Sequence, residues 1–348
     1  MKVYIVCPHI MTGGPKSLHQ LGDKLVDRGF QVFIFYGRNG IPSGETKLLF
    51  EDCKADVTNE IDDNGSNVLI MPESDTSWYF KFPKINKVIW WLSLDYYLYS
   101  NPLNRAIKIT KLKNQNSIRI PFRYIKYNFF ENKAKYIRKN KEFQEAYHLY
   151  NCEYVRLFLK RKAVYANKMS YLCGPIVLQK NNFLNREKII QNKKDIIAYN
   201  PAKVNNKMMN LIKEYMRVHF KQYKFIPIKN MNHNEVLKTL QSAKIYLDLG
   251  YFPGPERMPR EAVSNYCNII TSNIGSASNS VDVPIPNKFK FSLKKENIPD
   301  ICNLIVKMSD NFSDYLEYFD SYREKVRKQI QYFDEEIDTF TNAIKNCY

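Results

Sequence analysis

The chain has 348 residues, 44% of them hydrophobic, and a formal net charge of +18 at pH 7. This length exceeds one ordinary hydrophobic core, so we expect two domains, and the charge predicts attraction to polyanions such as nucleic acid, anionic lipid or phosphorylated substrates. The composition excludes a disordered chain, and the absence of any run of 18 apolar residues excludes a membrane-spanning helix.

The N-terminus and the cysteines both bear on where the protein is located. The sequence begins with a short apolar strand and lacks the pattern of a signal peptide. The seven cysteines form neither a CxxC pair nor a cluster with metal-binding spacing, which favours reduced, buried thiols. We therefore expect a cytoplasmic protein, either free or peripheral at the inner face of the plasma membrane, without a metal site.

Taken in chain order, the first part of the sequence alternates short apolar runs with amphipathic stretches. This pattern predicts a parallel sheet covered by helices. The expected elements are a strand Lys2–Cys7, a helix Pro15–Arg28, strands Gln31–Tyr36, Asn67–Met71 and Lys87–Leu92, a helix Glu142–Leu159 and a strand Met169–Leu172.

An insertion at 100–141 interrupts this alternation. From Arg105 to Lys141 it carries twelve Lys or Arg residues and one acidic residue, Glu131, among several aromatic residues. Such a segment indicates docking on an anionic membrane surface, or it is a solvated lysine-rich loop.

A polar stretch at 179–194 predicts a linker between an N-terminal domain, 1–178, and a C-terminal domain, 195–308. Helices are expected at 309–348 and would pack back across the domains. The elements expected after the linker are strands Asp195–Tyr199, Lys224–Ile228, Lys244–Leu249 and Asn268–Thr271, with helices Lys207–His219, Asn232–Ala243, Pro259–Tyr266, Tyr315–Tyr322 and Lys325–Phe340.

The segment Tyr246–Pro286 holds the densest set of candidate ligand-binding residues. Open parallel sheets bind ligands beyond the carboxyl ends of their strands, where arginine side chains and helix N-termini hold phosphates. Arg257 and Arg260 are therefore expected to contact a diphosphate. Glu261, expected in the first turn of a helix, either interacts with the helix dipole or accepts hydrogen bonds from the hydroxyl groups of a ribose. Asp248 is either structural or bound to the loop above it.

Two other strand ends carry candidate phosphate-binding residues. Gly13 and Gly14 follow the first strand, where they form a tight turn or let a ligand approach the backbone. A GxGxxG fingerprint is absent, which disfavours a nicotinamide-dependent dehydrogenase. Lys203 follows the first strand of the second domain, within reach of a pyrophosphate.

The fourth strand of the first domain ends in Trp90 and Trp91, with Asp95 shortly beyond it. The two tryptophans either pack in the core or face a sugar ring. Asp95 is a candidate catalytic base at this strand end.

These motifs together resemble the GT-B glycosyltransferases, in particular the nucleotide-sugar-dependent retaining group with glycogen synthase-like and sucrose synthase-like members. The segment PREAVSNYCNIITSNIGSAS is similar to the family pattern PxEAxxxGxPVIxSxxGG. The resemblance implies that Glu261 binds the ribose, Gly275 lies beside the phosphates, and Lys203 contacts the diphosphate. It also places Gly13 and Gly14 in the glycine loop, and Pro227–Met231, including Ile228, around the nucleobase.

The resemblance implies two Rossmann-like domains facing across a cleft and transfer of a sugar from a nucleoside diphosphate to a cell-surface polysaccharide or glycolipid precursor. Lysine and arginine, chiefly Lys203 and Arg257, would stabilise the leaving diphosphate, so neither a metal nor a cofactor is expected. One departure is Pro253, which stands eight residues before Glu261, where the family usually has another glutamate. An inactive GT-B subunit or scaffold is therefore an alternative, and a basic nucleic-acid-binding protein is another that the absence of a recognised module disfavours.

Overall fold

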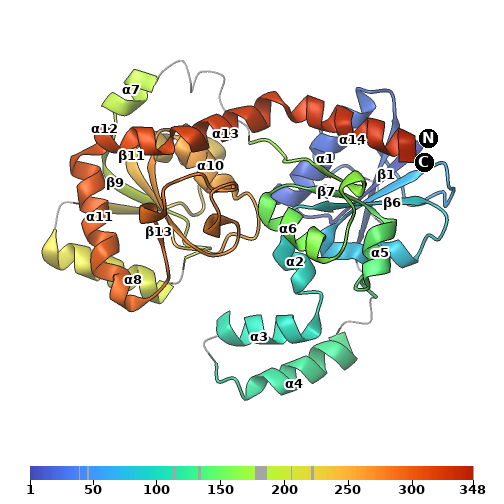
Figure 1. Ribbon diagram of the computed structural model, residues 1–348, viewed down its shortest axis with the longest axis horizontal. Coiled ribbons are helices and arrows are strands. Elements are labelled where there is room, and N and C mark those ends of the chain that lie inside the picture. The colour runs from blue at the N-terminus through green and yellow to red at the C-terminus, as the bar shows by residue number, and fades with distance from the viewer. Residues whose placement is uncertain are drawn as a thin grey trace. The chain divides into compact units, whose positions relative to one another are not determined.

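The computed structural model describes residues 1–38, 40–44, 47–112, 115–131, 135–176, 186–204, 206–220 and 223–347. The chain divides into two compact units, which are Met1–Gly174 together with Tyr332–Tyr348, and Pro175–Gln331. Each unit contains a largely parallel sheet flanked by helices (Figure 1). The predicted α/β class is confirmed.

The sheet of the first unit has the strand order β3-β2-β1-β5-β6-β7-β8, with β4 paired to β2. All neighbouring strands are parallel except β2 and β3. The strands are β1 (Lys2–Cys7), β2 (Gln31–Arg38), β3 (Ile41–Pro42), β4 (Asp56–Val57), β5 (Val68–Pro72), β6 (Asn86–Trp91), β7 (Tyr147–Tyr150) and β8 (Met169–Tyr171).

Side chains that alternate along β1 enter two apolar clusters, one on each face of this sheet. Val3 and Ile5 pack with α1 and α14, whereas Tyr4 and Val6 pack with residues of α6 on the other face. Burial on both faces explains why these strands are almost wholly apolar. The helices of the unit are α1 (Gly13–Val26), α2 (Leu94–Leu98), α3 (Pro102–Leu112), α4 (Arg119–Ile125), α5 (Asn140–Glu145), α6 (Glu153–Arg161) and α14 (Phe333–Cys347), with 3₁₀ segments Glu73–Phe80 and Ala166–Lys168 and a π-helix, Lys126–Glu131.

The second unit is built on a parallel sheet with the order β10-β9-β11-β12-β13. Its strands are β9 (Lys194–Tyr199), β10 (Lys224–Pro227), β11 (Ala243–Asp248), β12 (Asn268–Ser272) and β13 (Lys290–Phe291). Its helices are α7 (Arg186–Gln191), α8 (Asn206–His219), α9 (His233–Ser242), α10 (Arg257–Ser264), α11 (Ile298–Asp310), α12 (Phe312–Tyr315) and α13 (Asp320–Gln331), with 3₁₀ segments Ser276–Ser278, Asn287–Phe289, Lys295–Asn297 and Leu316–Phe319. In the part of the chain that the structure describes, none of the helices has the length and apolar character needed to span a bilayer.

The predicted helix Glu142–Leu159 is wrong, because β7 separates α5 from α6 within it. Strand β7 pairs with β6, and its His148 is fully buried. The indole of Trp91 donates to His148 Nδ1 at 2.9 Å, and the other ring nitrogen donates to the Phe143 carbonyl at 2.7 Å. Burial lowers the pKa of His148 to about 4, so the ring is neutral, as this arrangement requires.

The two tryptophans of β6 are core residues. Trp90 and Trp91 are both completely buried, and the Trp90 indole donates to the carbonyl of Leu172 at 3.1 Å. Of the two interpretations that the sequence left open, packing in the core is therefore the one that the structure supports.

The C-terminal helices divide between the two units. The predicted helix Lys325–Phe340 is interrupted at Tyr332, between α13 and α14. Helix α14 then joins the first unit, where Arg28 of α1 bonds Asp338 at 2.6 Å. Of the predicted linker 179–194, residues 179–185 lie outside the described part of the chain, and α7 occupies most of the remainder.

The packing of α14 on the first unit can be tested by the pH dependence of stability, through the partly buried carboxyl group of Glu336. Its carboxylate accepts from the Cys173 N–H at 3.3 Å, and burial raises its pKa to about 7. Because the folded state holds the proton more tightly than the unfolded state, stability should fall as the pH rises from the unfolded pKa of about 4 through 7. The side chain is partly exposed, so we expect Glu336→Gln to stabilise the unit by about 1 kcal/mol at pH 8 and by little at pH 4.

This prediction can be measured by urea unfolding monitored through tryptophan fluorescence. All three tryptophans, at positions 78, 90 and 91, belong to the first unit, so their emission reports that unit. The exposed neighbour Glu335→Gln is the matched control and should show no such difference. An equal effect of Glu336→Gln at both pH values would contradict the titration.

Candidate active site

The carboxyl edge of the second sheet brings three loops together. Lys203 lies in the turn after β9, Gly250 follows β11, and Ser272 ends β12. A Cβ atom on Gly250 would lie 2.9 Å from both the Cβ and the carbonyl oxygen of Lys203. The hydroxyl of Ser272 donates to the Gly250 carbonyl. Glycine at position 250 therefore allows the loop after β11 to contact the turn after β9.

Two ion pairs form at this edge. Lys203 pairs with Glu256, which occupies the N-cap position of α10. One turn further, Arg257 Nε donates to Glu261 Oε1 at 2.6 Å. The Glu261 side chain is only 2% exposed, whereas that of Arg257 is 38% exposed. The two cations are thus accessible, and each is held by a carboxylate that is more deeply buried.

Helix α10 begins two residues earlier than we predicted, at Arg257 rather than Pro259. Glu261 consequently lies in the second turn of the helix, and its predicted place in the first turn is wrong. Since the helix dipole acts mainly within the first turn, the dipole does not explain this carboxylate. The hydrogen bond from the Arg257 guanidinium instead accounts for a buried carboxylate at this position.

Asp248 holds the loop after β11. The Tyr246 hydroxyl donates to one carboxylate oxygen at 3.1 Å, and the Gly250 N–H donates to the other at 3.2 Å. Burial raises the pKa of Asp248, while the charge of Lys203 and the two hydrogen bonds act in the opposite direction. Both interpretations of Asp248 thus apply, because it is buried and also bound to the loop above it.

Gly275 connects the loops that follow β11 and β12. It has φ +70° and ψ −137°, and it forms an isolated parallel bridge with Phe252. The next residue, Ser276, donates its N–H to the Phe252 carbonyl at 2.8 Å and its hydroxyl to the Gly254 carbonyl at 2.7 Å. A conformation reserved for glycine therefore fixes this part of the site.

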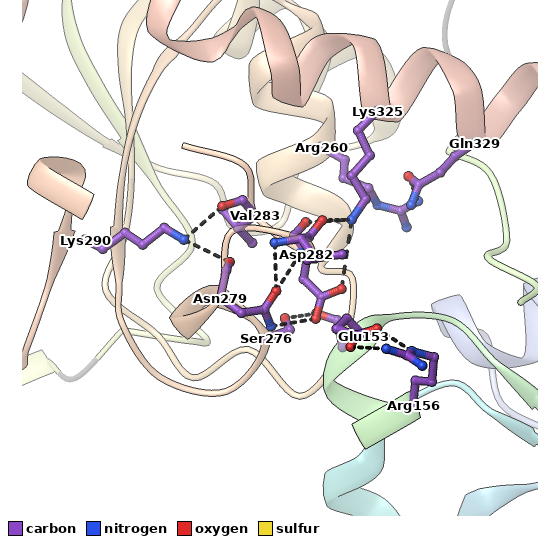
Figure 2. A network of polar contacts seen from close by, with 12 residues as sticks. Glu153, Arg156, Arg260, Ser276, Asn279, Asp282, Val283, Lys290, Lys325 and Gln329 are labelled. Atoms are coloured by element: carbon purple, nitrogen blue, oxygen red, sulfur yellow. Dashed lines mark hydrogen bonds and ion pairs between the residues drawn. The ribbon is translucent and has the colours of Figure 1, made fainter. Parts of the chain in front are cut away.

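Arg260 has a different environment from Arg257. It is 6% exposed, and its guanidinium donates to the Glu256 carbonyl at 3.3 Å. It also donates to Gln329 of α13 at 3.3 Å, and Figure 2 shows both of these side chains. The contact with Gln329 ties α10 to α13, whereas Lys203 and Arg257 pair with the carboxylates of Glu256 and Glu261.

Ile228 lies just beyond β10 and is half-buried. Its N–H donates to the Tyr199 carbonyl at 2.8 Å, at the end of β9. This bond places the predicted nucleobase-binding backbone beside the strand that leads to Lys203.

The remaining predicted residues belong to the first unit. Gly13 and Gly14 begin α1, and a Cβ atom added to Gly14 would lie 3.6 Å from Leu92 Cδ1, whereas one added to Gly13 would meet nothing within 4 Å. Asp95 is buried in α2, where it accepts from the Tyr99 hydroxyl at 2.8 Å and lies 3.9 Å from Lys108 Nζ. Asp95 is thus engaged by two neighbouring side chains.

A polar network that the sequence did not predict holds the chain after Gly275. Lys290 Nζ donates to the carbonyls of Asn279 at 3.0 Å and Val283 at 2.9 Å, while Lys325 Nζ reaches the Asp282 carbonyl at 3.1 Å (Figure 2). Burial lowers the pKa of Lys290 to about 8. Because the acceptors of Lys290 are backbone carbonyls, no side-chain motif could have identified them. Within the described ranges, no group of three or more His, Cys, Asp or Glu residues is arranged to hold a metal ion.

Searches among family models and curated proteins found no match to this chain. Solved structures do match it over nearly the whole length. They include a sucrose-phosphate synthase from Thermosynechococcus elongatus, with TM-score 0.61, 10% identity and 100% of both chains covered. A glycosyltransferase from Rickettsia africae ESF-5 matches with TM-score 0.60, 12% identity and 99% of both chains covered. HepE of Anabaena in complex with UDP-glucose matches with TM-score 0.56, 10% identity, and 98% of this chain and 100% of that chain covered.

These likenesses identify the fold as GT-B, the two-domain α/β fold of the matched glycosyltransferases, which the sequence predicted. At 10 to 12% identity, they carry no residue roles to this chain.

Proposed function

We propose that this protein is a glycosyltransferase that moves a sugar from a nucleoside diphosphate to a hydroxyl group of a polysaccharide or glycolipid precursor. The observation that carries the proposal is the pair of accessible cations, Lys203 and Arg257, at the carboxyl edge of a parallel sheet. That edge is where open α/β sheets bind ligands. The fold shared with HepE, whose structure contains UDP-glucose, also supports this proposal.

In this proposal the donor diphosphate binds Lys203 and Arg257, which stabilise it as it leaves the sugar. Glu261 accepts hydrogen bonds from the ribose hydroxyls, and the backbone at Gly275 lies close to the phosphates. Both cations are paired with carboxylates in the structure, so the diphosphate would replace or share these partners. The charge supplied by the two side chains makes a metal unnecessary.

Glu256 is a candidate to replace the glutamate that the family pattern has at the position of Pro253. It lies three residues later in the chain, and its carboxylate sits at the start of α10 against Lys203. We assign it to the donor sugar, whose hydroxyls a carboxylate binds well. We propose that transfer retains the configuration of the sugar, as the resemblance of the sequence to the retaining group implies. In the inverting alternative, Asp95 is the candidate base.

A thermal-shift screen across UDP, GDP, CMP, TDP and ADP tests whether the site takes a nucleotide and which one. We expect one of these nucleotides to raise the midpoint of the wild-type protein clearly above the others. Lys203→Ala should weaken its binding about tenfold in calorimetry, since one charge-assisted contact to a phosphate contributes about 1.5 kcal/mol or more. Lys238→Ala, which removes an exposed lysine of α9, is a matched control and should bind normally.

An inactive GT-B subunit is the second candidate, and Pro253 is the feature that favours it. Such a protein would bind a nucleotide or a partner without transferring or hydrolysing the sugar. Release of free nucleoside diphosphate from the matching nucleotide sugar distinguishes the two. If binding occurs but no release is detected with any acceptor or with water, the inactive subunit is the better description.

A further inference from the structure

The insertion of the first unit forms a helical hairpin. Helix α3 packs along α4 and the π-helix that continues it, and Figure 1 shows α3 and α4 beside each other. Arg123 of α4 donates to the Thr110 hydroxyl at 3.2 Å, and the Arg105 guanidinium lies 4.4 Å from the ring centroid of Tyr127. These contacts define the inner face of the second helix of the hairpin.

The outer face of the same helix is apolar and exposed. Ile118, Phe122, Ile125 and Phe129 are spaced four, three and four residues apart, so they form one stripe on a helix. Their exposed fractions are 69%, 71%, 48% and 65%. None of the seven residues of α4 is buried. Four large apolar side chains in one exposed stripe indicate an interaction surface.

The charge around this stripe is almost entirely positive. Arg119 and Lys126 are exposed on the same helical segment. From Arg105 to Lys141 the sequence has twelve basic residues and one acidic residue. A helix with an apolar stripe flanked by basic residues is suited to lie in the interface of an anionic bilayer, because the ring and aliphatic side chains enter the acyl boundary while the cations remain among the head groups.

We propose that the outer face of α4 and the π-helix docks this protein on an anionic membrane surface. The partner is the lipid bilayer itself, selected by charge complementarity and by the four-residue apolar stripe. Nucleic acid would satisfy the charges and stack on the two phenylalanines, but it would leave the two isoleucines without a matching surface. This inference stands on the hairpin alone and does not depend on the proposed transferase activity.

Co-sedimentation of the full chain with phosphatidylcholine vesicles, with and without phosphatidylglycerol, tests the docking. We expect binding to the anionic vesicles that weakens as salt is added. Arg119→Gln and Lys126→Gln should each lower the partition coefficient about fivefold, the effect of one basic residue near such a surface. The double variant Phe122→Ser/Phe129→Ser should lower it by about tenfold or more.

Two control variants match these changes at other exposed positions. Lys160→Gln/Arg161→Gln removes two positive charges from the end of α6, as Arg119→Gln/Lys126→Gln does from the hairpin. Val218→Ser removes an apolar side chain that is 52% exposed on α8. Both should bind vesicles as the parent does. Phe122→Trp keeps the apolar stripe, and its emission should be quenched by brominated lipid, which reports insertion directly.

Equal binding to neutral and anionic vesicles would overturn the proposal, as would parental binding by Phe122→Ser/Phe129→Ser. Tight, salt-sensitive binding to duplex DNA that is lost in Arg119→Gln/Lys126→Gln, with no vesicle binding, would identify nucleic acid as the partner instead. Because the substituted side chains are exposed, the variants should melt at the parental temperature.

Discussion

Replacing Glu261 by alanine is expected to weaken nucleotide binding about 100-fold, the largest binding effect of any single substitution at the site. A buried carboxylate that accepts two hydroxyl hydrogen bonds contributes about 3 kcal/mol, at the lower end for bonds to a charged group. The structure supplies the preorganisation, since Glu261 is 2% exposed and its Oε1 atom is fixed by Arg257 at 2.6 Å. Isothermal calorimetry with the nucleotide found by the screen measures the change.

Two further variants complete this test, one that removes only the charge of Glu261 and one that serves as a control. Glu261→Gln keeps one acceptor oxygen and should lose less affinity, about tenfold. Glu214→Ala removes an exposed carboxylate that is paired with Arg217 on α8, and it should leave affinity unchanged. Parental affinity in both Glu261→Ala and Lys203→Ala would exclude this edge of the sheet as the nucleotide site.

Gly275→Ala is expected to destabilise the second unit by about 3 kcal/mol or more. The residue has φ +70°, which costs a non-glycine residue about 1 to 3 kcal/mol. A Cβ atom would in addition lie 2.1 Å from the Phe252 carbonyl oxygen, which is a backbone atom and cannot rotate away. Relief of this overlap requires separation of the loops after β11 and β12, so nucleotide affinity should fall with stability.

The location of the tryptophans allows this effect to be assigned to the correct unit. Far-ultraviolet circular dichroism follows the helices of both units, whereas tryptophan fluorescence follows the first unit alone. Gly275→Ala should shift the urea transition seen by circular dichroism and have less effect on the fluorescence transition. Gly65→Ala is the control, because its nearest contact is 3.8 Å away and it should change neither transition by much. An unshifted circular dichroism transition in Gly275→Ala would contradict the role of this bridge.

The sequence was sufficient to locate most strands because they are buried on both faces. The runs Lys2–Cys7 and Asn268–Thr271 have apolar centres, Val3–Cys7 and Ile269–Ile270, and are followed by polar or glycine-containing turns. The structure has strands β1 and β12 at these places. Strand β7 was not predicted, because its four residues continue the mixed apolar and polar pattern of the helices α5 and α6 on either side. Its pairing with β6 and the contacts of His148 with Trp91 decide its conformation, and both are distant in sequence.

By itself, the sequence determined the α/β class, the parallel strands and the segment at whose strand ends the candidate residues lie, since hydrophobic periodicity and glycine or proline punctuation are local properties. The tertiary structure alone decided which charges meet. It paired Lys203 with Glu256 and Arg257 with Glu261, directed Arg260 to Gln329, and returned α14 to the first unit. Such contacts depend on where each loop and helix begins in space, and a shift of two residues at the start of α10 was enough to change the environment of Glu261.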